Sequence, residues 1–439
     1  MKAEYRRVRF NRRSYNNKLK RIKHSNSSPS REGVKARAQA GEVTLMERNP
    51  QSNRFEQQLK TFLRILESYK EDKPLTKFLP DFFRRNKQMG STDRKTASSL
   101  LYNYFRLGRA CANLPTEERL FLAEFLISNA PNAFLRNFKP ELDEKIELSL
   151  IEKIAFIESQ DIGFALNDVF PFHTHLSKDV DQEEFLRSFF IQPDLFIHLY
   201  PEKTAWVSSK LEDAGVSYQE EDERSLHLPN GTKLDQIFPD NKYFEVQDLS
   251  SQEASKFFKP QKYDYWWDCC AASGGKSINL FHQQPDIKLL VSDIRESVLE
   301  NLDERFSNAG LRKYQKKILD LTKDPQPFIH SYEFDGIIYD APCTGSGTWG
   351  RSPEMISQFQ EYRIKAFQNL QQSISRNIVK YLKPGKPLIY ITCSVFKEEN
   401  EEMIDFLVKE MGLKLELKKV LKGYDRKSDT MFVARLIKA

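Results

Sequence analysis

Apolar residues in the first part of the chain recur at helical spacing. One stretch places them three and four positions apart, at Phe55, Leu59, Phe62, Leu63, Leu66 and Tyr69. This spacing gives an α-helix a single apolar face. Ser91-Thr92-Asp93 offers an N-cap to a second helix, and Pro115-Thr116 opens a third. We therefore predict that residues 50–170 are mostly helical and that their aromatic side chains form a core.

Short apolar runs alternate with helical patterns in the next part of the chain. The predicted elements are, in order, a strand at 195–199, a helix at 202–214, a strand at 225–228 and a helix at 249–258. Pro229-Asn230-Gly231 is typical of a turn after the second strand. Strands and helices that alternate over so short a segment indicate a small α+β domain, which we place at residues 190–260.

The last part of the chain, residues 262–439, repeats a strand that ends at an acidic residue. Predicted strands at 288–292, 317–319 and 334–339 are followed directly by Asp293, Asp320 and Asp340. Strand ends at roughly 25-residue intervals, with helical segments between them, are typical of βαβ units and a parallel sheet. Further elements are expected in this order: a single helix at 354–382, a strand at 388–392, a helix at 398–410, and two closing strands at 413–419 and 430–437.

The turn after the first of these strands carries the clearest signal for a ligand. The run 266–281 reads as a buried strand, a turn with Gly274 and Gly275, and the first turns of a helix. Unpaired N–H groups at such a helix start bind nucleotide-like ligands at the carboxyl ends of parallel strands. Asp293 follows about 20 residues later, where an acidic residue accepts the hydroxyls of a ribose. Neither GxGxxG nor a P-loop pattern is present, so a dinucleotide or a triphosphate is disfavoured.

Composition narrows the class of protein. The chain has 439 residues, which is too long for a single core, so two to four domains are expected. No apolar run reaches the ~18 residues of a membrane span, and the basic N-terminus has no apolar core of a signal peptide. The five cysteines form no CxxC pair. We expect a cytoplasmic protein with free thiols and without a zinc or other metal site.

The basic charge of the chain is concentrated in its first residues. The net charge of +6 combines +11 from residues 1–40 with −5 from the other 399 residues. Residues 1–45 have too few apolar side chains to fold and are expected to be a disordered arm. They fit an RNA-binding arm or a non-native extension, since Met46 resembles an ordinary start. A second group of cations, 84–95, fits phosphate contact or a solvated face equally well.

Three motifs in one order resemble the RsmB/NOP family of RNA 5-methylcytosine methyltransferases. Residues 268–276 (DCCAASGGK) resemble its D-x-C-A-A-P-G-G-K, and residues 340–348 (DAPCTGSGT) resemble its D-A-P-C-S-G-x-G-T. Residues 390–400 (YITCSVFKEEN) resemble its Y-x-T-C-S-x-x-x-x-E-N. The resemblance covers about residues 190–438. Ser273 departs from the usual Pro, and Gly350 stands where a basic residue is common.

The resemblance implies a fold and a cofactor. The fold is α/β, a class I (Rossmann-like) methyltransferase with a seven-stranded sheet over 262–439 whose last strands form an antiparallel hairpin. It follows an RRM-like domain over 190–260 and a NusB-like helical domain over 50–170. The cofactor is S-adenosylmethionine. Its implied binding residues are Cys270, Ala271, Ala272, Ser273, Gly274, Gly275, Lys276, Asp293 at the ribose, Asp320 at the adenine, and Asp340.

The resemblance also implies the chemistry. Carbon 5 of cytosine is a poor nucleophile until a thiolate adds to carbon 6. Cys393 is the implied nucleophile, and Cys343 promotes release of the product. Asp340 is expected at the cytosine edge near N3. Lys276, or a nearby helix N-terminus, is expected to favour the thiolate form of Cys393.

The expected substrate is RNA, either ribosomal or transfer RNA, and the expected state is a monomer. A class I methyltransferase for another RNA or a protein would not need both Cys343 and Cys393. A rival of another class is a catalytically idle RNA-binding or ribosome-assembly factor on the same fold. Intact Asp293, Asp340 and both cysteines argue against that rival.

Overall fold

The computed structural model describes residues 50–70, 73–160, 162–240 and 242–439. The predictions for residues 1–45 lie outside the described residues. No helix in the described ranges is long and apolar enough to cross a bilayer.

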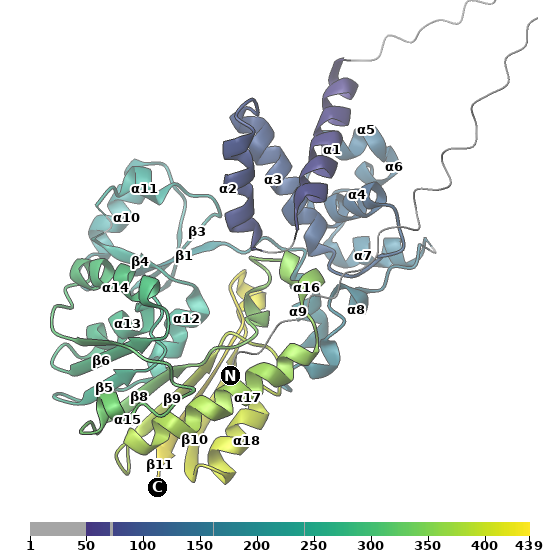
Figure 1. Ribbon diagram of the computed structural model, residues 1–439. Helices are drawn as coiled ribbons and strands as arrows, with labels where there is room; N and C mark the ends of the chain where they lie inside the picture. Colours follow the sequence, from purple (N-terminus) through teal and green to yellow (C-terminus); the bar gives the residue numbers. More distant parts are fainter. Residues whose placement is uncertain (1–49, 71–72, 161, 241) are drawn as a thin grey trace, which may run out of the picture. The chain divides into compact units, whose positions relative to one another are not determined.

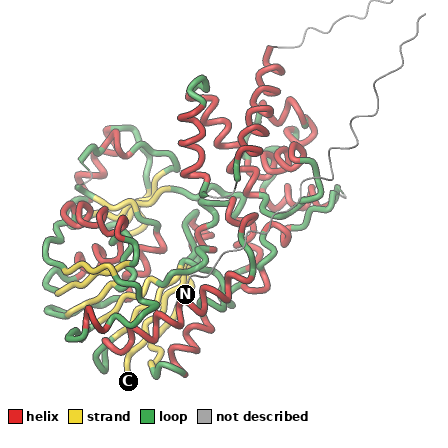
Figure 2. Tube along the Cα trace, viewed as in Figure 1, coloured by secondary structure: helices red, strands yellow, loops and turns green. Residues whose placement is uncertain are grey.

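The first described part of the chain is helical, as predicted (Figure 2). Its α-helices are α1 (Pro50–Ser68), α2 (Leu75–Arg85), α3 (Ser91–Arg106), α4 (Thr116–Ile127), α5 (Ala133–Phe138), α6 (Pro140–Asp143), α7 (Leu150–Glu158), α8 (Leu166–Val169) and α9 (Gln182–Ser188). The aromatic side chains of α1 and α3 pack together, with Phe62 and Tyr104 rings 5.4 Å apart. The predicted cap at Ser91-Thr92-Asp93 is wrong, because the N-cap is Gly90 and no side chain there accepts a capping hydrogen bond.

A four-stranded antiparallel sheet follows, with strand order β2-β3-β1-β4. Its elements are β1 (Leu195–Leu199), α10 (Thr204–Asp213), β2 (Gln219–Asp222), β3 (Ser225–Leu228), α11 (Leu234–Ile237) and β4 (Phe244–Val246). The strands β2 and β4 escaped prediction, because β2 is polar and β4 has three residues. The turn at 229–231 does not join two strands, since it leads into α11. The assignment of this region to an RRM-like domain stays a prediction.

The seven-stranded sheet has the order β10-β11-β9-β8-β5-β6-β7. Its strands are β5 (Tyr265–Asp268), β6 (Lys288–Asp293), β7 (Gln315–Ile318), β8 (Gly336–Asp340), β9 (Pro387–Thr392), β10 (Leu413–Leu421) and β11 (Met431–Lys438). The strands β5 to β9 are parallel, and β11 is antiparallel to both β9 and β10. This is the predicted class I methyltransferase sheet, including the closing hairpin (Figure 1).

Helices cover both faces of this sheet. Apolar residues of α12 (Leu249–Ala254), α13 (Gly275–Gln283) and α14 (Glu296–Asn308) pack with one face. The other face packs with α17 (Tyr362–Ile378) and α18 (Glu401–Lys409). Every strand that carries a predicted site residue therefore ends at one edge, the carboxyl edge of the parallel strands.

The predicted single helix at 354–382 is wrong. It is divided into α16 (Glu354–Gln358), α17 and a 3₁₀ turn at Val379–Tyr381. Phe359 interrupts it with an extended backbone, φ −70° and ψ 139°. Its side chain is buried against Trp349 and Phe172. Burial of this aromatic ring thus outweighs the helical pattern around it. The predicted third strand is also shifted, since β7 ends at Ile318 and excludes Leu319.

Candidate active site

The turn after β5 is shaped by a glycine that no other residue could replace. Trp266 and Trp267 are fully buried and anchor the strand. Gly274 has a φ of +84° and caps α13. A Cβ on Gly274 would lie 2.4 Å from a ring carbon of Phe306, so both conformation and space require glycine. Residues 269–274 consequently cross the carboxyl edge as a compact loop ahead of the helix start.

Asp293 lies against this loop, where the sequence predicted it. Its carboxylate accepts a hydrogen bond from the Ala272 amide at 3.1 Å and from the Arg295 Nε at 3.0 Å. Although burial opposes the effect, the bonds from Arg295 and Ala272 hold the pKa of Asp293 below its usual value. Asp293 is therefore a charged, nearly buried acceptor at the end of β6.

Asp320 lies on the neighbouring strand end. The Leu319 amide donates to the Asp293 carbonyl at 3.1 Å, which brings the two segments side by side. The Asp320 carboxylate accepts from the Thr322 hydroxyl at 2.6 Å and pairs with Lys323 at 3.1 Å. The hydrogen bond from Thr322 is the main reason that the pKa of Asp320 is lowered. No contact between the Asp320 and Asp293 side chains is recorded among the described residues.

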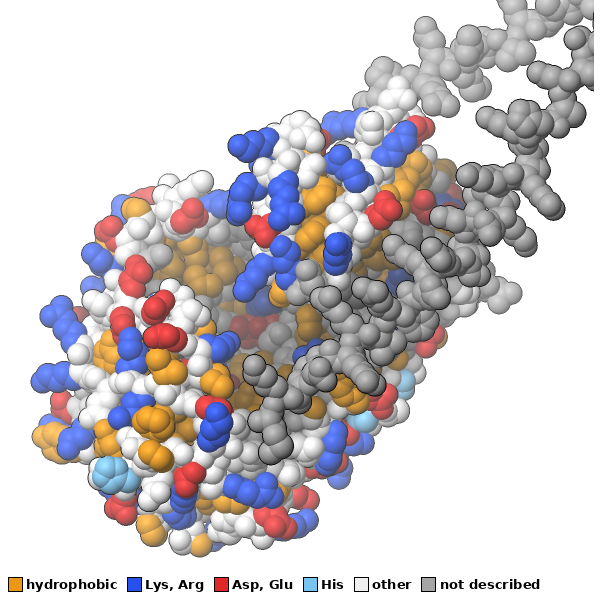
Figure 3. All heavy atoms as spheres, in the orientation of Figure 1, with side chains coloured by type: hydrophobic (Ala, Val, Ile, Leu, Met, Phe, Trp, Pro, Cys, Tyr) orange, Lys and Arg blue, Asp and Glu red, His pale blue; other side chains and the backbone are white. Residues whose placement is uncertain are grey.

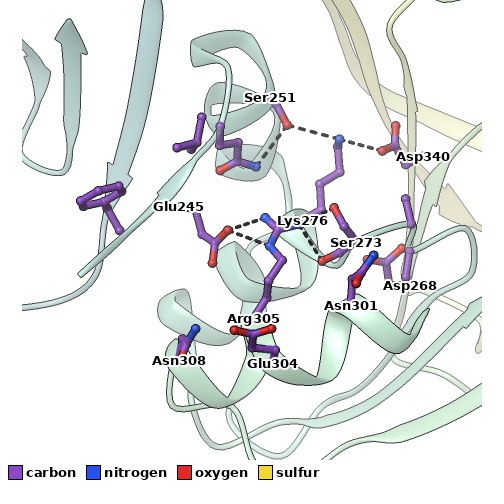
Figure 4. Close-up of a pocket in the computed structure, with 16 residues that line it drawn as sticks. Glu245, Ser251, Asp268, Ser273, Lys276, Asn301, Glu304, Arg305, Asn308 and Asp340 are labelled. Atoms are coloured by element: carbon purple, nitrogen blue, oxygen red, sulfur yellow. Dashed lines mark hydrogen bonds and ion pairs between the residues drawn. The ribbon is translucent and has the colours of Figure 1, made fainter. Parts of the chain in front are cut away.

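A cavity of about 560 Å³ opens between the loop, β4 and α14 (Figure 4). Among the predicted residues, its lining includes Ala271, Ala272, Ser273, Gly275, Lys276 and Asp340. Asp293, Asp320 and the two predicted catalytic cysteines do not line it. Further lining residues, not predicted from the sequence, lie on β4, on α12, between these two elements and along α14. They include Glu245, Gln247, Ser251, Asn301, Glu304, Arg305 and Asn308.

Lys276 and Asp340 form an ion pair at the N-terminus of α13. The Lys276 Nζ lies 2.7 Å from the Asp340 Oδ2 and 3.4 Å from the Ser251 hydroxyl. Burial alone would lower the pKa of Lys276, but the charge of Asp340 and its hydrogen bond raise that pKa above its ordinary value, with a contribution from Cys393. Lys276 is thus a fixed positive charge paired with Asp340.

The two predicted catalytic cysteines are in contact. Cys343 follows β8 and Cys393 follows β9, and their sulfur atoms lie 3.3 Å apart. The hydrogen bond with Cys393, together with burial, raises the pKa of Cys343 well above its ordinary value. Cys343 is therefore held as a thiol. Cys393 contributes to the raised pKa of Lys276, so a positive charge lies near this second thiol.

A buried carboxylate, Glu399, ties the two cysteine loops together. It is fully buried and accepts from the Thr344 amide at 2.9 Å, the Thr344 hydroxyl at 2.5 Å and the Gln371 amide at 3.0 Å. The Ser394 hydroxyl also donates to it. Burial raises the pKa of Glu399. The sequence marked Glu399 only as part of a motif, and its polar neighbours Glu398, Asn400 and Glu401 gave no local signal that it is buried.

Asn400 supports the same loop. Its amide donates to the Ser394 carbonyl and to the Ser177 hydroxyl, both at 2.9 Å, and its oxygen accepts from Thr392 at 2.6 Å. Within the described ranges, no group of three or more His, Cys, Asp or Glu side chains could hold a metal ion. The arrangement offers a thiol nucleophile, a second thiol, an ammonium–carboxylate pair and a ligand-binding loop on one edge.

Part of the chain matches the model of a known protein family. Residues 255–436 match the family model described as 16S rRNA methyltransferase RsmB/F. A relative named ribosomal RNA small subunit methyltransferase B, from Shewanella oneidensis, is 33% identical over 172 residues. That alignment covers 39% of this chain and 40% of the relative, so less than half of the relative's length is matched.

Solved structures resemble more of the chain. PH0851 covers 89% of this chain and 99% of its own, with a TM-score of 0.64 and 20% identity. NSun6 from Pyrococcus horikoshii, solved with SFG, covers 61% of this chain and 97% of its own, with a TM-score of 0.54 and 16% identity. At these identities the likeness establishes the fold.

Proposed function

We propose that this chain, whose residues 255–436 match the family model of 16S rRNA methyltransferase RsmB/F, makes 5-methylcytosine in ribosomal RNA with S-adenosylmethionine as methyl donor. The observation that carries the proposal is the 3.3 Å contact between the Cys343 and Cys393 sulfur atoms. Methyl transfer to a nucleophilic nitrogen or oxygen requires no cysteine. Carbon 5 of cytosine must first be activated by a nucleophile, which accounts for a thiol at this edge.

The residues at the edge fit S-adenosylmethionine. The loop 269–275 leads into a helix start that no side chain caps among the described residues, and Asp293 is a charged acceptor beside this loop. The Asp268 Oδ1 is buried without a hydrogen-bond partner among the described residues, which suits a donor such as an amino group. NSun6 was solved with SFG, an analogue of S-adenosylmethionine. When bound, the cofactor supplies a methyl group carried on a sulfonium.

Each side chain then has a defined task. The Cys393 thiolate adds to carbon 6 of the cytosine, which makes carbon 5 nucleophilic, and the Lys276 ammonium stabilises that thiolate. Asp340 holds the cytosine edge near N3, oriented by Lys276. After carbon 5 is methylated, a water molecule accepts its proton and the electrons of that C–H bond re-form the ring double bond. The bond between Cys393 and carbon 6 then breaks with its electron pair left on the Cys393 sulfur as a thiolate. Cys343, held as a thiol, promotes this last step.

The RNA substrate is inferred from the relative's name and from a basic surface. Figure 3 shows Lys and Arg side chains gathered over α2 and α3. The segment 73–95 has a net charge of +5, and its exposed cations are Lys77, Arg84, Arg85, Lys87 and Lys95. A local surplus of positive charge on an otherwise acidic body suits phosphate contacts. Small-subunit ribosomal RNA is the preferred substrate, and transfer RNA is the alternative.

The competing function is a catalytically idle RNA-binding or assembly factor. Incubation of the protein with tritiated S-adenosylmethionine and a 16S ribosomal RNA transcript separates the two. We expect tritium in the RNA, and bisulfite sequencing should then reveal a newly protected cytosine. RNA binding without label would favour the assembly factor, and label without a protected cytosine would place the methyl group on another atom.

A further inference from the structure

Ser273 lies in the cofactor loop at the position where the resembling motif has proline. A proline fixes φ near −65° and so stiffens a loop before any ligand binds. Serine provides no such constraint. Unless other contacts stiffen it, a loop with Ser273 would lose more conformational entropy when it closes on a cofactor.

The Arg305 guanidinium supplies contacts to this loop. Arg305 projects from α14, and its Nη1 donates to the Ser273 carbonyl at 2.8 Å and also contacts the Ser273 hydroxyl (Figure 4). One charged group therefore holds both the backbone and the side chain of the same loop residue. Hydrogen bonds from a charged donor are stronger than those between neutral groups.

Arg305 is itself held from the four-stranded sheet. Its Nε donates to the Glu245 Oε2 at 2.9 Å, and its Nη2 contacts the same carboxylate oxygen. The Glu245 side chain on β4 is 7% exposed, and its other oxygen accepts from the Tyr200 hydroxyl at 2.5 Å. Both edges of the planar guanidinium are thus engaged, one by Glu245 and the other by Ser273.

The same segment of the chain holds the start of α13 in two further places. The Asn279 amide donates to the Gln247 side-chain oxygen at 3.0 Å, and Lys276 reaches the Ser251 hydroxyl at 3.4 Å. A Cβ on Gly275 would lie 3.4 Å from the Gln247 amide nitrogen. The segment from β4 to α12 is therefore packed directly on the helix that carries Lys276.

We propose that Arg305 is a positioning residue for the cofactor loop and supplies, through Ser273, the rigidity that proline would give. Glu245 orients Arg305, so the four-stranded sheet takes part in forming the cofactor site of the neighbouring domain. The inference rests on the proposed function, because it assumes that the loop 270–276 binds S-adenosylmethionine. It concerns how this chain holds that loop without proline.

The alternative is that Arg305 and Glu245 only join two parts of the protein. In that case, loss of Arg305 lowers stability without a specific effect at residue 273. The two accounts differ in whether proline at 273 makes Arg305 dispensable. The two accounts therefore predict different coupling between positions 305 and 273, which a double-mutant cycle measures.

The experiment measures S-adenosylhomocysteine binding by isothermal titration. Arg305→Met should weaken binding about tenfold in the wild-type background. In the Ser273→Pro background, the same replacement should weaken it by no more than about threefold. Arg312→Met removes an exposed arginine outside the cavity and should leave the affinity unchanged. An equal loss in both backgrounds, or no loss in either, would overturn the proposal.

Arg305→Met leaves the Glu245 carboxylate buried without its cation and could therefore fold poorly. A second set of variants keeps the test valid in that case. Adding Glu245→Gln removes that charge, and the same dependence on Ser273→Pro should hold in this background. Hydrogen exchange separates the inference from the proposed function. If the wild-type protein binds no S-adenosylhomocysteine, the proposed function fails, whereas faster amide exchange at 271–274 in Arg305→Met is still expected. Unchanged exchange there would contradict the positioning role itself.

Discussion

The two halves of the carboxyl edge are held in different ways. The thiol side, residues 340–346 and 392–400, is organised by Glu399 and Asn400, both fully buried. The cofactor side, residues 268–276, 293–295 and 320, has more exposed neighbours, since Ile294 is 59% exposed and Ile318 is 51% exposed. The proposed reactive groups are thus fixed by buried hydrogen bonds, whereas the proposed cofactor residues, including the buried Asp293, lie next to exposed side chains.

This difference indicates which part of the site keeps its geometry before a ligand binds. Four donors converge on Glu399 from three segments, so the two cysteines keep their relative position without a ligand. Asp293 is engaged mainly by Arg295, two residues away, and by one loop amide. Replacements on the thiol side should therefore reduce turnover, whereas replacements on the cofactor side should reduce affinity for the cofactor.

Glu399→Gln should have the largest effect outside the cysteines. The amide NH₂ would face at least one of the donors that now bind the carboxylate, so a buried group would be left unsatisfied. We expect kcat to fall at least about 100-fold and the free energy of unfolding to fall by about 1–3 kcal/mol. Glu410→Gln, on an exposed side chain after α18, is the matched control. An unchanged kcat with a weaker cofactor affinity would remove the distinction between the two sides.

Asp293→Ala should show the opposite pattern. It removes the charged acceptor proposed for the ribose hydroxyls and should weaken S-adenosylmethionine binding by roughly 1–3 kcal/mol. With saturating cofactor, kcat should change much less than the affinity. Isothermal titration and steady-state kinetics measure the two quantities. Asp286→Ala, on an exposed surface residue, should alter neither, and an unchanged affinity in Asp293→Ala would refute the assignment of Asp293.

Asp268 lies between the two sides and should make stability depend on pH. Burial, with the nearby Asp340 and Asp293 charges, raises the pKa of Asp268 to about 7, although Ser277 and Lys276 oppose this. A carboxyl whose folded pKa is raised stabilises the fold below its unfolded pKa, and this contribution is lost as pH rises to about 7. As pH rises from 5 to 8, the free energy of unfolding of Asp268→Asn should therefore increase by about 1 kcal/mol or more relative to that of the wild type. Urea unfolding at both pH values measures this, and a constant difference would show that Asp268 does not titrate there.

Removal of residues 1–45 should have the smallest effect. The proposed cofactor residues all lie between 268 and 340, so S-adenosylmethionine affinity should stay within about twofold. If the arm binds RNA, its removal should also flatten the dependence of RNA affinity on salt. An unchanged salt dependence would identify the arm as an extension without a role in RNA binding.

The sequence was informative where function depends on strand ends. Asp293 and Asp340 end their strands and the two cysteines follow theirs, and parallel strands bring their carboxyl ends to one edge whatever connects them. This explains why residues as distant as Cys343 and Cys393 could be expected together before any distance was known. The closing antiparallel hairpin was expected only from the resemblance to class I methyltransferases, because regular alternation of strands and helices predicts parallel strands alone.

Contacts between regions were not predictable in the same way. Arg305 occupies an ordinary position on an amphipathic helix, and Glu245 lies on a three-residue strand that escaped prediction. The contacts of Arg305 with Glu245 and with Ser273 depend on how the four-stranded sheet packs against the loop, which no local pattern encodes. The break at Phe359 has the same origin, because a buried aromatic cluster from three segments overrides the helical periodicity.

The central claim is that the two cysteines act at different steps, and one gel assay tests it most directly. Cys393→Ala and Cys343→Ala proteins are incubated with RNA and S-adenosylmethionine and then denatured. If Cys393 adds to carbon 6 and Cys343 assists release, Cys343→Ala should accumulate a covalent protein–RNA complex and Cys393→Ala should form none, because losing the last step traps the intermediate and losing the first prevents it. A complex in Cys393→Ala alone would reverse the two roles. Retained activity without a complex in either variant would show that the reaction does not use these thiols.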